Sequence, residues 1–290
     1  MERILVTGAS GFIGQSLCEA LPNLNTIFIG TDLYPHSSSV LKIDIRDSNS
    51  LKIIGDFKPD VIVHLAAQVD VAESFRNPVV DLESNILGTV NLLQAAVVSG
   101  VQNFIYVASG GAIYDENKTR PTNEWDALNL KSPYGISKLA AEFYVKVLAD
   151  RYGLTWSSLA LSNCYGPVSQ CKKGVIYRFW ENLSKKVTPT INGPMTTRDF
   201  IYVSDVIGAI IAAIENPTNC RVNISTGKET SLIDLFTLIS KHMDVRIVPI
   251  IGELDSIEVA RSCFDNSLAK SLLGWKPKIP VDEGIRLALL

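Results

Sequence analysis

Short apolar runs alternate with longer amphipathic stretches along the first two-thirds of the chain. The runs are rich in β-branched and aromatic residues and are bounded by turn residues, which is typical of buried strands. We predict strands at residues 4–6, 26–29, 40–43, 61–63 and 104–108, and helices at 48–57, 78–99, 134–152 and 204–215. Strands that alternate with helices in this way indicate a parallel α/β sheet.

The longest apolar stripe lies in the predicted helix 78–99, which Gly100 should end. Asn85 and Gly88 interrupt this stripe. Asn85 could be a solvated surface residue, but in a helix that packs beneath a ligand we expect it to anchor the backbone of the next strand. The stripe consists of Val79, Leu82, Ile86, Val90, Leu93 and Val97.

Composition and charge exclude several classes of protein. The 290 residues suit one large or two small domains, and a hydrophobic content of 47% is ample for a core. A net charge of −3 gives no basic field, so we expect no nucleic-acid partner. Without an apolar run of about 18 residues or a signal-peptide pattern, we expect a cytoplasmic protein without a membrane span. The five cysteines form no C-x-x-C pair, so we expect reduced thiols and no metal site.

The first apolar run leads directly into three evenly spaced glycines, Gly8, Gly11 and Gly14. Glycine permits positive φ and lets a backbone approach a pyrophosphate closely, and the N-terminus of the following helix offers N–H groups to the anion. Asp32 follows the next run, eighteen residues past Gly14. A carboxylate there can accept the ribose hydroxyls of NAD and repels the 2′-phosphate of NADP, so the pattern predicts NAD binding.

Small residues follow two further strands, at 65–67 and at 109–112, where ligands of open α/β sheets bind. Such residues would let a cofactor lie against the backbone. We interpret His64 as a structural residue at a strand end, because a catalytic histidine needs a cleft and a partner. Residues 115–131 are polar and rich in turn formers, which predicts a loop over the site.

Tyr134 and Lys138 lie one turn apart on one face of the predicted helix that begins near Pro133. An ammonium near a phenol, with the positive nicotinamide of NAD close by, favours the phenolate. It should lower the tyrosine pKa from about 10 toward the working pH and make a general base. Taken alone, this spacing also suits an ordinary amphipathic helix with a surface lysine.

With all these features together, the chain resembles the extended short-chain dehydrogenases/reductases, and among them the NAD-dependent nucleotide-sugar epimerase/dehydratase family. The motifs that carry the resemblance follow the family's order over nearly the whole length. They are TGASGFIG at 7–14, Asp32, DI at 44–45, HLAAQ at 64–68, SFRNP at 74–78, N-x-x-G-T-x-N at 85–91, YGISK at 134–138, NCYGP at 163–167, RDFIYVSDV at 198–206, NISTG at 223–227 and LGWKP at 273–277.

The resemblance implies a Rossmann-type α/β fold with a doubly wound parallel sheet. Residues 1–162 and about 194–224 would form this NAD-binding domain. Residues 163–193 and 225–290 would form a smaller C-terminal α/β domain that binds a nucleotide sugar.

The resemblance also assigns roles to single residues. It implies that Tyr134, Lys138 and Ser109 are catalytic. It implies that these three and a larger set contact NAD, namely Gly8, Gly11, Phe12, Ile13, Gly14, Asp32, Asp44, Ile45, Leu65, Ala66, Ala67 and Asn85. The substrate, a UDP-linked sugar, would be contacted by Gln68, Gly110, Gly111, Asn163, Val175, Arg198 and Arg261. For Arg198, the alternative to a phosphate contact is an ion pair with Asp199.

Three positions depart from the family pattern. Gly110 stands where the family usually has its catalytic Ser or Thr, so Ser109, water or the glycine backbone must take that role. Ala160 replaces the strand arginine before the Asn-x-Tyr-Gly-Pro motif. The C-terminal R-x-G-D motif is degraded at residues 255–258, which leaves Arg261 as the nearest substitute for its diphosphate arginine.

The residues after Ser109 narrow the reaction. Gly111 and Ala112 stand where 4,6-dehydratases carry an acid/base pair and uronate decarboxylases a glutamate. The resemblance therefore favours a UDP-hexose 4-epimerase. Tyr134 would take the 4-hydroxyl proton while hydride leaves C4, and a 4-keto intermediate would rotate before the hydride returns. A net NAD(P)-dependent nucleotide-sugar reductase or dehydrogenase, and a non-catalytic NAD-binding module, remain the alternatives.

The helices near 79–98 and 134–152 carry more apolar residues than one sheet-facing stripe requires, among them Leu92, Phe143, Val147 and Leu148. Family members commonly pair through these two helices. The resemblance therefore implies a homodimer held by a four-helix bundle.

Overall fold

The computed structural model describes residues 1–114, 120–254 and 259–290. The strands are β1 (Glu2–Thr7), β2 (Thr26–Asp32), β3 (Val40–Lys42), β4 (Val61–His64), β5 (Asn103–Ser109), β6 (Thr155–Leu161), β7 (Asn163–Tyr165), β8 (Thr190–Asn192), β9 (Thr197–Arg198), β10 (Phe200–Tyr202), β11 (Arg221–Ile224), β12 (Thr230–Ser231) and β13 (Ile250–Gly252). The α-helices are α1 (Phe12–Ala20), α2 (Lys52–Phe57), α3 (Val71–Arg76), α4 (Pro78–Leu82), α5 (Gly88–Ser99), α6 (Pro133–Tyr152), α7 (Gly174–Ser184), α8 (Val203–Glu215), α9 (Leu232–His242), α10 (Ser267–Leu273) and α11 (Val281–Ala288). A π-helical turn (Glu83–Leu87) joins α4 to α5, and 3-10 turns occupy Leu21–Asn23, Ser48–Leu51 and Gly110–Ala112.

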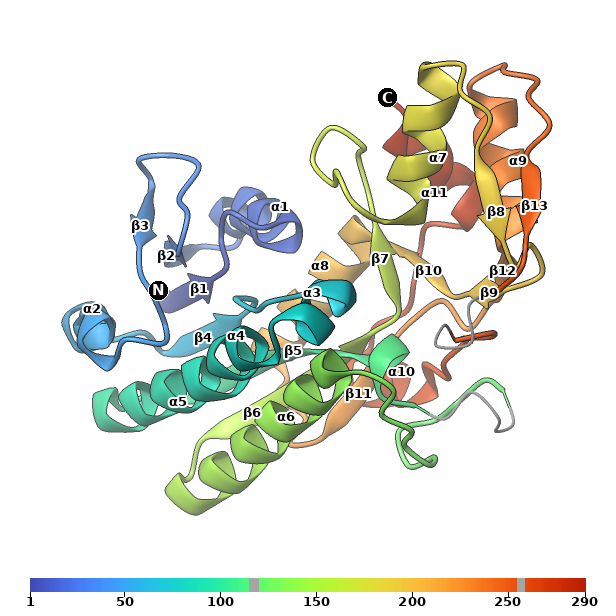
Figure 1. Cartoon of the computed structure of the whole chain (residues 1–290). Helices are drawn as coiled ribbons and strands as arrows, with labels where there is room; N and C mark the ends of the chain where they lie inside the picture. Colours follow the sequence, from blue (N-terminus) through green and yellow to red (C-terminus); the bar gives the residue numbers. More distant parts are fainter. Residues whose placement is uncertain (115–119, 255–258) are drawn as a thin grey trace.

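Seven parallel strands form the main sheet, in the order β11-β6-β5-β4-β1-β2-β3 (Figure 1). The chain starts at β1, runs outward through β2 and β3, and then returns to add β4, β5 and β6 on the other side. This reversal between β1 and β4 is the switch point where open α/β sheets bind ligands. The predicted Rossmann-type fold is confirmed.

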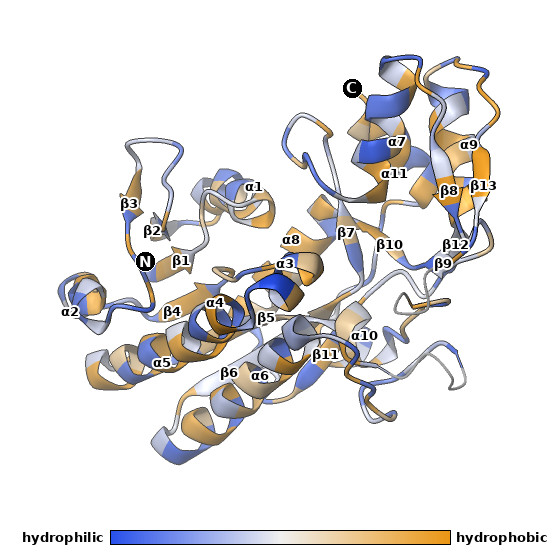
Figure 2. Ribbon diagram, in the orientation of Figure 1, coloured by the Kyte–Doolittle hydropathy of each residue, from blue (hydrophilic) through white to orange (hydrophobic). Residues whose placement is uncertain are grey.

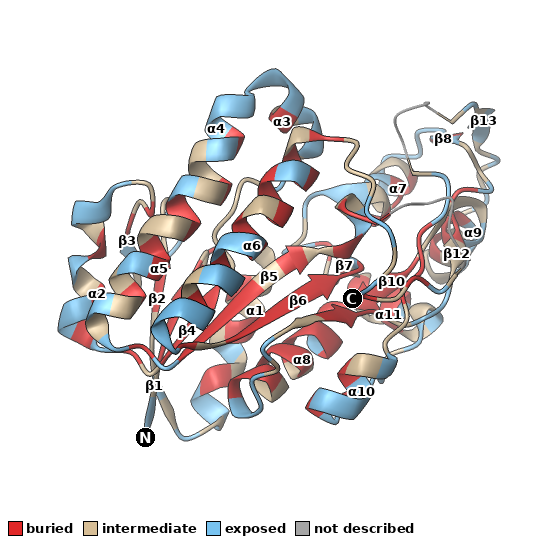
Figure 3. Cartoon of the chain, turned by 90° about the horizontal axis from the view of Figure 1, so that it is seen from below, coloured by how far each residue is buried: buried red, intermediate tan, exposed pale blue. Residues whose placement is uncertain are grey.

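Apolar residues of the main sheet point alternately into two cores, one on each face. The strands of this sheet are largely buried between the helices that cover them (Figure 3). In β1, Ile4 and Val6 pack with α1 and α8, whereas Leu5 packs with α5 and α6. Strands covered by helices on both faces are buried throughout, which explains why they appear in the sequence as short continuous apolar runs.

The part of the chain after β6 adds three two-stranded sheets beside the main one (Figure 1). β7 pairs with β10, β9 with β12, and β8 with β13, whose hydrophobic residues appear orange in Figure 2. β11 returns to the edge of the main sheet beside β6, and α8 packs into one of its cores. The division into two domains at the predicted boundaries stays a prediction.

The predicted apolar stripe of helix 78–99 is wrong in its first half. Val79 and Leu82 are 65% and 51% exposed, whereas Asp81 and Asn85 are buried. This helix packs beneath the carboxyl ends of the strands, where hydrogen-bonding side chains are needed, so its polar residues face inward. Gly88 lies in the same buried face.

The residues described include no membrane-length apolar helix. They also include no group of three or more His, Cys, Asp or Glu side chains placed to hold a metal ion. All five cysteines, each in a described part of the chain, are free of disulfides.

Candidate functional site

The glycine turn joins β1 to α1, and it leaves no room for side chains at Gly8 and Gly14. Gly8 has a φ of +70°, and a Cβ there would lie 2.7 Å from the nitrogen of Ala66. A Cβ at Gly14 would overlap the carbonyl oxygen of Gly8, to which Gly11 donates a hydrogen bond. The first N–H groups of α1 have no partners within the helix. The turn therefore fits the pyrophosphate of a dinucleotide.

Asp32, the last residue of β2, is aimed at this turn. One carboxylate oxygen accepts a hydrogen bond from the Ser10 nitrogen at 3.0 Å and the other from the Tyr34 nitrogen at 2.9 Å. Each oxygen keeps a lone pair for a ribose hydroxyl. The residues that form the dinucleotide side of the site thus fit NAD.

Asp44 and Ile45 lie just after β3. Arg46 binds the Asp44 carboxylate at 2.7 Å, and its hydrogen bonds hold the pKa of that carboxyl below its usual range. The Ile45 side chain packs where a Cβ at Gly88 would be. Their predicted contacts with NAD stay predictions.

A first test concerns the choice of cofactor. Because the Asp32 carboxylate lies where a 2′-phosphate would enter, we expect NAD to bind at least about tenfold more tightly than NADP, a gap of about 1.4 kcal/mol. Calorimetric titration of both dinucleotides measures this gap, and Asp32→Ser should narrow it. Equal affinities in the unchanged chain would contradict the assignment.

Tyr134 and Ser109 meet at the carboxyl end of β5. The Ser132 hydroxyl caps α6 by accepting a hydrogen bond from the Gly135 nitrogen at 3.1 Å, and this places Tyr134 in the first turn. Tyr134 is buried, and the side chain of Ser109, the last residue of β5, lies close enough to act on the pKa of its phenol. The structure thus brings together two of the three predicted catalytic residues.

The predicted lowering of the Tyr134 pKa applies with NAD bound and stays a prediction, whereas the chain by itself shows the opposite direction. Burial raises the pKa of Tyr134, because it disfavours the phenolate. The hydrogen bond from Ser109 works against this rise, and the negative charge of Asp81 adds to it.

Lys138 is buried one turn further along α6, with its Nζ 4.2 Å from the centroid of the Tyr106 ring. Burial lowers the pKa of Lys138 to about 7, although the charges of Glu142 and Asp81 act to raise it. Lys138 therefore loses its proton more readily than an exposed lysine does.

The position of Ser109 accounts for the departure at Gly110. A Cβ on Gly110 would lie 3.1 Å from the Phe264 ring and 3.3 Å from the Leu161 carbonyl oxygen. A side chain at 110 would thus point at Phe264, whereas Ser109 reaches Tyr134. Gly111 is open, with nothing within 4 Å of a Cβ built there.

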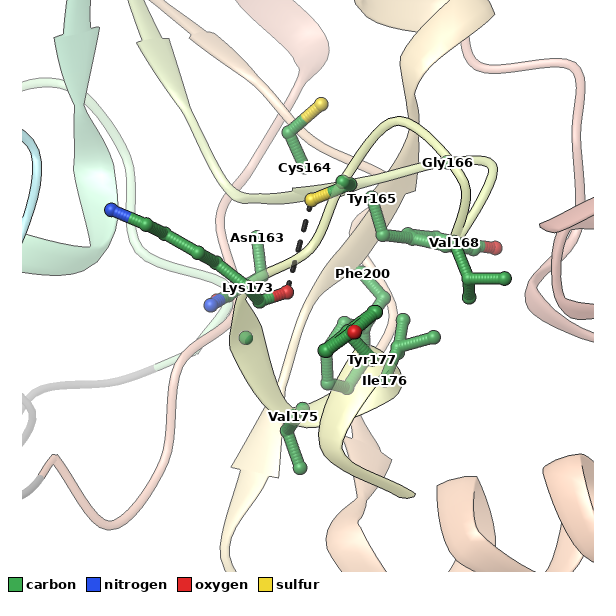
Figure 4. Close-up of a pocket in the computed structure, with 12 residues that line it drawn as sticks. Asn163, Cys164, Tyr165, Gly166, Val168, Lys173, Val175, Ile176, Tyr177 and Phe200 are labelled. Carbon is green, nitrogen blue, oxygen red and sulfur yellow. Dashed lines mark hydrogen bonds between the residues drawn. The ribbon is translucent and has the colours of Figure 1, made fainter. Parts of the chain in front are cut away.

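A pocket of about 70 Å³ lies between β7, β10 and the start of α7 (Figure 4). Asn163 and Lys173 give it polar groups, and Val175 lies at its edge. Gly166, in its wall, lies beside the start of α1, because a Cβ there would lie 2.8 Å from the Phe12 ring. One wall of the pocket thus adjoins the helix that follows the glycine turn.

Two arginines predicted to contact substrate lie close to one another in the chain's C-terminal part, Arg198 in β9 and Arg261 in a segment that bridges to β9. Arg198 ends β9 and donates a hydrogen bond to the Thr197 carbonyl at 2.9 Å. The backbone of Arg261 forms an isolated β-bridge with Thr197, and its side chain forms an ion pair with Glu229 at 2.7 Å. Arg261 also lines a small pocket with Gly110 and Gly111. The degraded motif at 255–258, and part of the predicted loop, at 115–119, lie outside the described residues.

The Asp199 carboxylate next to Arg198 is buried and holds the loop after β11. It accepts hydrogen bonds from the Thr226 nitrogen and hydroxyl, at 2.9 and 2.7 Å, and from the Gly227 nitrogen at 2.9 Å. Sequence reasoning considered Asp199 only as a partner for Arg198 and missed this role.

The prediction for the anchoring role of Asn85 is wrong about its partner. Its side-chain oxygen accepts a hydrogen bond from the Gln68 nitrogen at 2.8 Å, and its amide nitrogen donates to the Gln68 carbonyl at 3.0 Å. Asn85 therefore anchors the segment after β4 and not the next strand. The side chain of Gln68 donates in turn to Asp81 at 2.8 Å, so both candidate ligand contacts stay predictions.

Sequence reasoning also missed three side chains beside the site. Asp81 and Glu142 carry the buried charges that act on Lys138, and Phe264 fills the space beside Gly110. Glu142 pairs with Arg221 of β11 at 2.6 Å. The spacing of Glu142, one turn past Lys138 on the same face, was the available signal.

A family model described as the NAD dependent epimerase/dehydratase family matches residues 4–225. A UDP-glucose 4-epimerase of Mycolicibacterium smegmatis is 35% identical over 98% of this chain and 96% of that protein. The crystal structure of Thermotoga maritima UDP-glucose 4-epimerase with UDP-glucose matches with a TM-score of 0.94 and 34% identity, over 99% of this chain and 97% of that one. The Thermus thermophilus UDP-glucose 4-epimerase complex with NAD matches with a TM-score of 0.90 and 31% identity, also over 99% and 97%.

Proposed function

The chain belongs to the NAD-dependent epimerase/dehydratase family, and we propose that it epimerises a UDP-linked hexose at C4 through a transient 4-keto intermediate. The family predicted from the sequence is confirmed, and NAD is its cofactor. One observation supports 4-epimerisation most directly. Ser109 acts on the pKa of the buried Tyr134 phenol, and the positions after Ser109 are glycine, glycine and alanine, without the acid that elimination or decarboxylation needs.

In this proposal Tyr134 removes the proton from the sugar's 4-hydroxyl, and Ser109 donates a hydrogen bond to the same oxygen. When bound, NAD supplies the acceptor and later the source of the hydride. Burial keeps Tyr134 protonated in the chain by itself. Positive charge beside the phenol, partly from Lys138, lowers the pKa of Tyr134 and so opposes the effect of burial. The phenolate can then accept the proton when substrate is present.

The substrate would extend from Tyr134 into the C-terminal part of the chain, which we propose as the nucleotide-sugar domain with the predicted boundaries. The pocket between β7 and α7 suits the nucleotide, since Tyr177 and Phe200 line it with aromatic rings and Asn163 supplies hydrogen-bonding groups. Arg198 and Arg261 are the proposed phosphate contacts, because a guanidinium binds phosphate oxygens in pairs.

Incubation with a panel of nucleotide sugars, without added cofactor, tests the reaction. We expect two C4 epimers of a UDP-hexose to interconvert, detected by stereoisomer-resolved mass spectrometry, with no lasting change in absorbance at about 340 nm. A steady change that requires added NAD(P)H would instead indicate the reductase or dehydrogenase. Tight NAD binding without any turnover would indicate a non-catalytic module.

We also propose that two copies pair through the face formed by α4, α5 and α6. This face exposes apolar side chains, with Phe143 53% and Val147 61% exposed on α6 alone. The expectation that Leu92 contributes to this face is wrong, because Leu92 lies fully inside a core of the main sheet. Leu148 is partly buried against that core.

Light scattering at micromolar concentration should therefore give about twice the chain mass of 31.7 kDa. Phe143→Glu with Val147→Glu should give the monomer, since a charge at a packed apolar interface is costly. Val248→Glu, at a still more exposed valine in the C-terminal part, is the control and should leave the dimer intact. A monomer in the unchanged chain would refute the pairing.

A further inference from the structure

Five buried polar side chains connect the glycine turn to the first turn of α6. They are Thr7, His64, Thr89, Asn85 and Ser137, and none is more than 3% exposed. Groups buried to this degree are cut off from bulk solvent, and these find hydrogen-bond partners in the protein. Their order in space therefore fixes which atom donates and which accepts.

The direction of the chain follows from one carbonyl. The Thr89 hydroxyl lies 2.6 Å from the Asn85 carbonyl oxygen, which can only accept, so Thr89 donates there. Toward His64, Thr89 can then only accept, and the proton between them, over 2.9 Å, belongs to Nε2 of His64. Burial lowers the pKa of His64 to about 3, so the ring is neutral and its Nδ1 is an acceptor.

The other side of His64 leads to the dinucleotide turn. Thr7, the last residue of β1, donates its hydroxyl proton to Nδ1 of His64 over 2.8 Å. The same hydroxyl oxygen accepts a hydrogen bond from the Ala66 nitrogen at 3.2 Å. The segment after β4 is therefore tied to β1 directly beside Gly8, where the two backbones touch.

The far side leads to the candidate base. The Asn85 amide nitrogen donates to the Ser137 hydroxyl oxygen at 3.0 Å, and the Ser137 hydroxyl donates to the Tyr134 carbonyl at 3.0 Å. Asn85 also holds both backbone groups of Gln68. A continuous hydrogen-bond network thus connects β1, the segment 66–68 and the backbone of Tyr134.

We propose that His64, held as its Nε2–H tautomer, is a positioning residue that fixes the Tyr134 backbone relative to the dinucleotide turn. The proposal rests on the proposed function in one respect, that Tyr134 is the base. Hydride and proton must leave one carbon and its oxygen together, so a small shift between the cofactor side and Tyr134 slows the reaction. The neutral His64 ring has one acceptor, which takes the Thr7 proton, and one donor, which serves the Thr89 oxygen. Without this ring the two hydroxyls are no longer linked.

The tautomer can be measured without any substrate. Two-dimensional NMR of the chain labelled with 15N-histidine, in which His64 is assigned from the spectrum of His64→Phe, should show a neutral ring with its proton on Nε2 from pH 5 to pH 8. A proton on Nδ1, or a charged ring in this pH range, would overturn the proposal even if the chain proves not to be an epimerase.

Kinetics then separate positioning from a purely structural role. His64→Phe keeps a ring but removes both nitrogens, and we expect kcat to fall by up to about 10²-fold with KM for the sugar nearly unchanged. The dissociation constant of NAD should rise several-fold. His64→Gln restores one donor and one acceptor and should recover part of kcat. Thr89→Val keeps the shape of the threonine but removes its hydroxyl, so it should reproduce the loss.

Ser157→Ala is the matched control. Ser157 is fully buried in β6 and accepts a hydrogen bond from the Thr218 nitrogen at 2.9 Å, so its loss should lower stability comparably while leaving kcat and NAD affinity unchanged. If His64→Phe and Thr89→Val lower stability but keep kcat and NAD affinity within about twofold, the proposal fails. If no nucleotide sugar is turned over, the proposed function fails separately, and the tautomer and NAD affinity still decide the positioning role.

Discussion

Tyr134→Phe should slow the chemical step by about 10²-fold to 10⁴-fold and leave NAD binding nearly intact. The variant keeps the ring, which is buried in the first turn of α6, and removes only the phenol hydroxyl. Without that hydroxyl the 4-hydroxyl proton has no acceptor at this position. Single-turnover formation of the epimer, with NAD content measured on the same sample, gives both quantities.

Two comparisons make this result specific to the base. Tyr152→Phe, at the exposed end of the same helix, should leave turnover unchanged. Ser109→Ala should slow the step less than Tyr134→Phe, because it removes one hydrogen bond and leaves the proton acceptor in place. Near-normal turnover by Tyr134→Phe would show that the proposed mechanism is wrong and that another group serves as the base.

Lys138→Met should abolish most activity and yet make the chain more stable at low pH. The folded pKa of Lys138 is about 7, below the value of about 10.4 of an exposed lysine. Between these two values the unfolded chain binds more protons at this group than the folded chain does. The contribution of Lys138 to the free energy of unfolding therefore rises with pH in this window, and it is least favourable below about pH 7, where the charge must be buried.

Replacing Lys138 by methionine removes the buried charge and leaves Glu142 paired with Arg221 at 2.6 Å. We expect the free energy of unfolding at pH 6 to rise by about 1–4 kcal/mol, with the gain shrinking toward pH 10. Urea unfolding across this pH range measures the effect. Lys146→Met, at an exposed lysine of α6 that pairs with Asp150, should change stability by less than about 0.5 kcal/mol.

A stability gain that does not depend on pH would contradict the burial argument. The activity loss has a separate cause, because methionine has no charge to favour the phenolate of Tyr134. A stable variant with near-normal turnover would therefore show that Lys138 has no part in activating the tyrosine.

Patterns of local spacing revealed the fold and most of the proposed site residues. Apolar runs predicted strands because residues of a strand buried on both faces are apolar without a break. The glycine turn could be recognised because strand, turn and helix are consecutive in the chain. Tyr134 and Lys138 could be paired because one helical turn brings them together.

Local patterns failed where the partner of a residue lies far along the chain. The first half of the apolar stripe of helix 78–99 is exposed, because periodicity does not show whether apolar residues face a core or an exposed surface. The partner of Asn85 could not be predicted, since Gln68 comes from the loop after another strand. Nothing near Gly110 in the sequence announces that Phe264 occupies the adjacent space.

The sequence by itself determined the family, the fold, the cofactor, and which side chains lie near the carboxyl ends of the strands, because these depend on residues close together in the chain. Tertiary structure alone decided the protonation of those side chains. The pKa values of Tyr134, Lys138 and His64 are set by burial, and burial depends on helices and strands that fold together from distant parts of the sequence. It also decided that His64 joins Thr7 to Thr89, because a hydrogen bond between residues so far apart exists only once the sheet and its covering helix have packed.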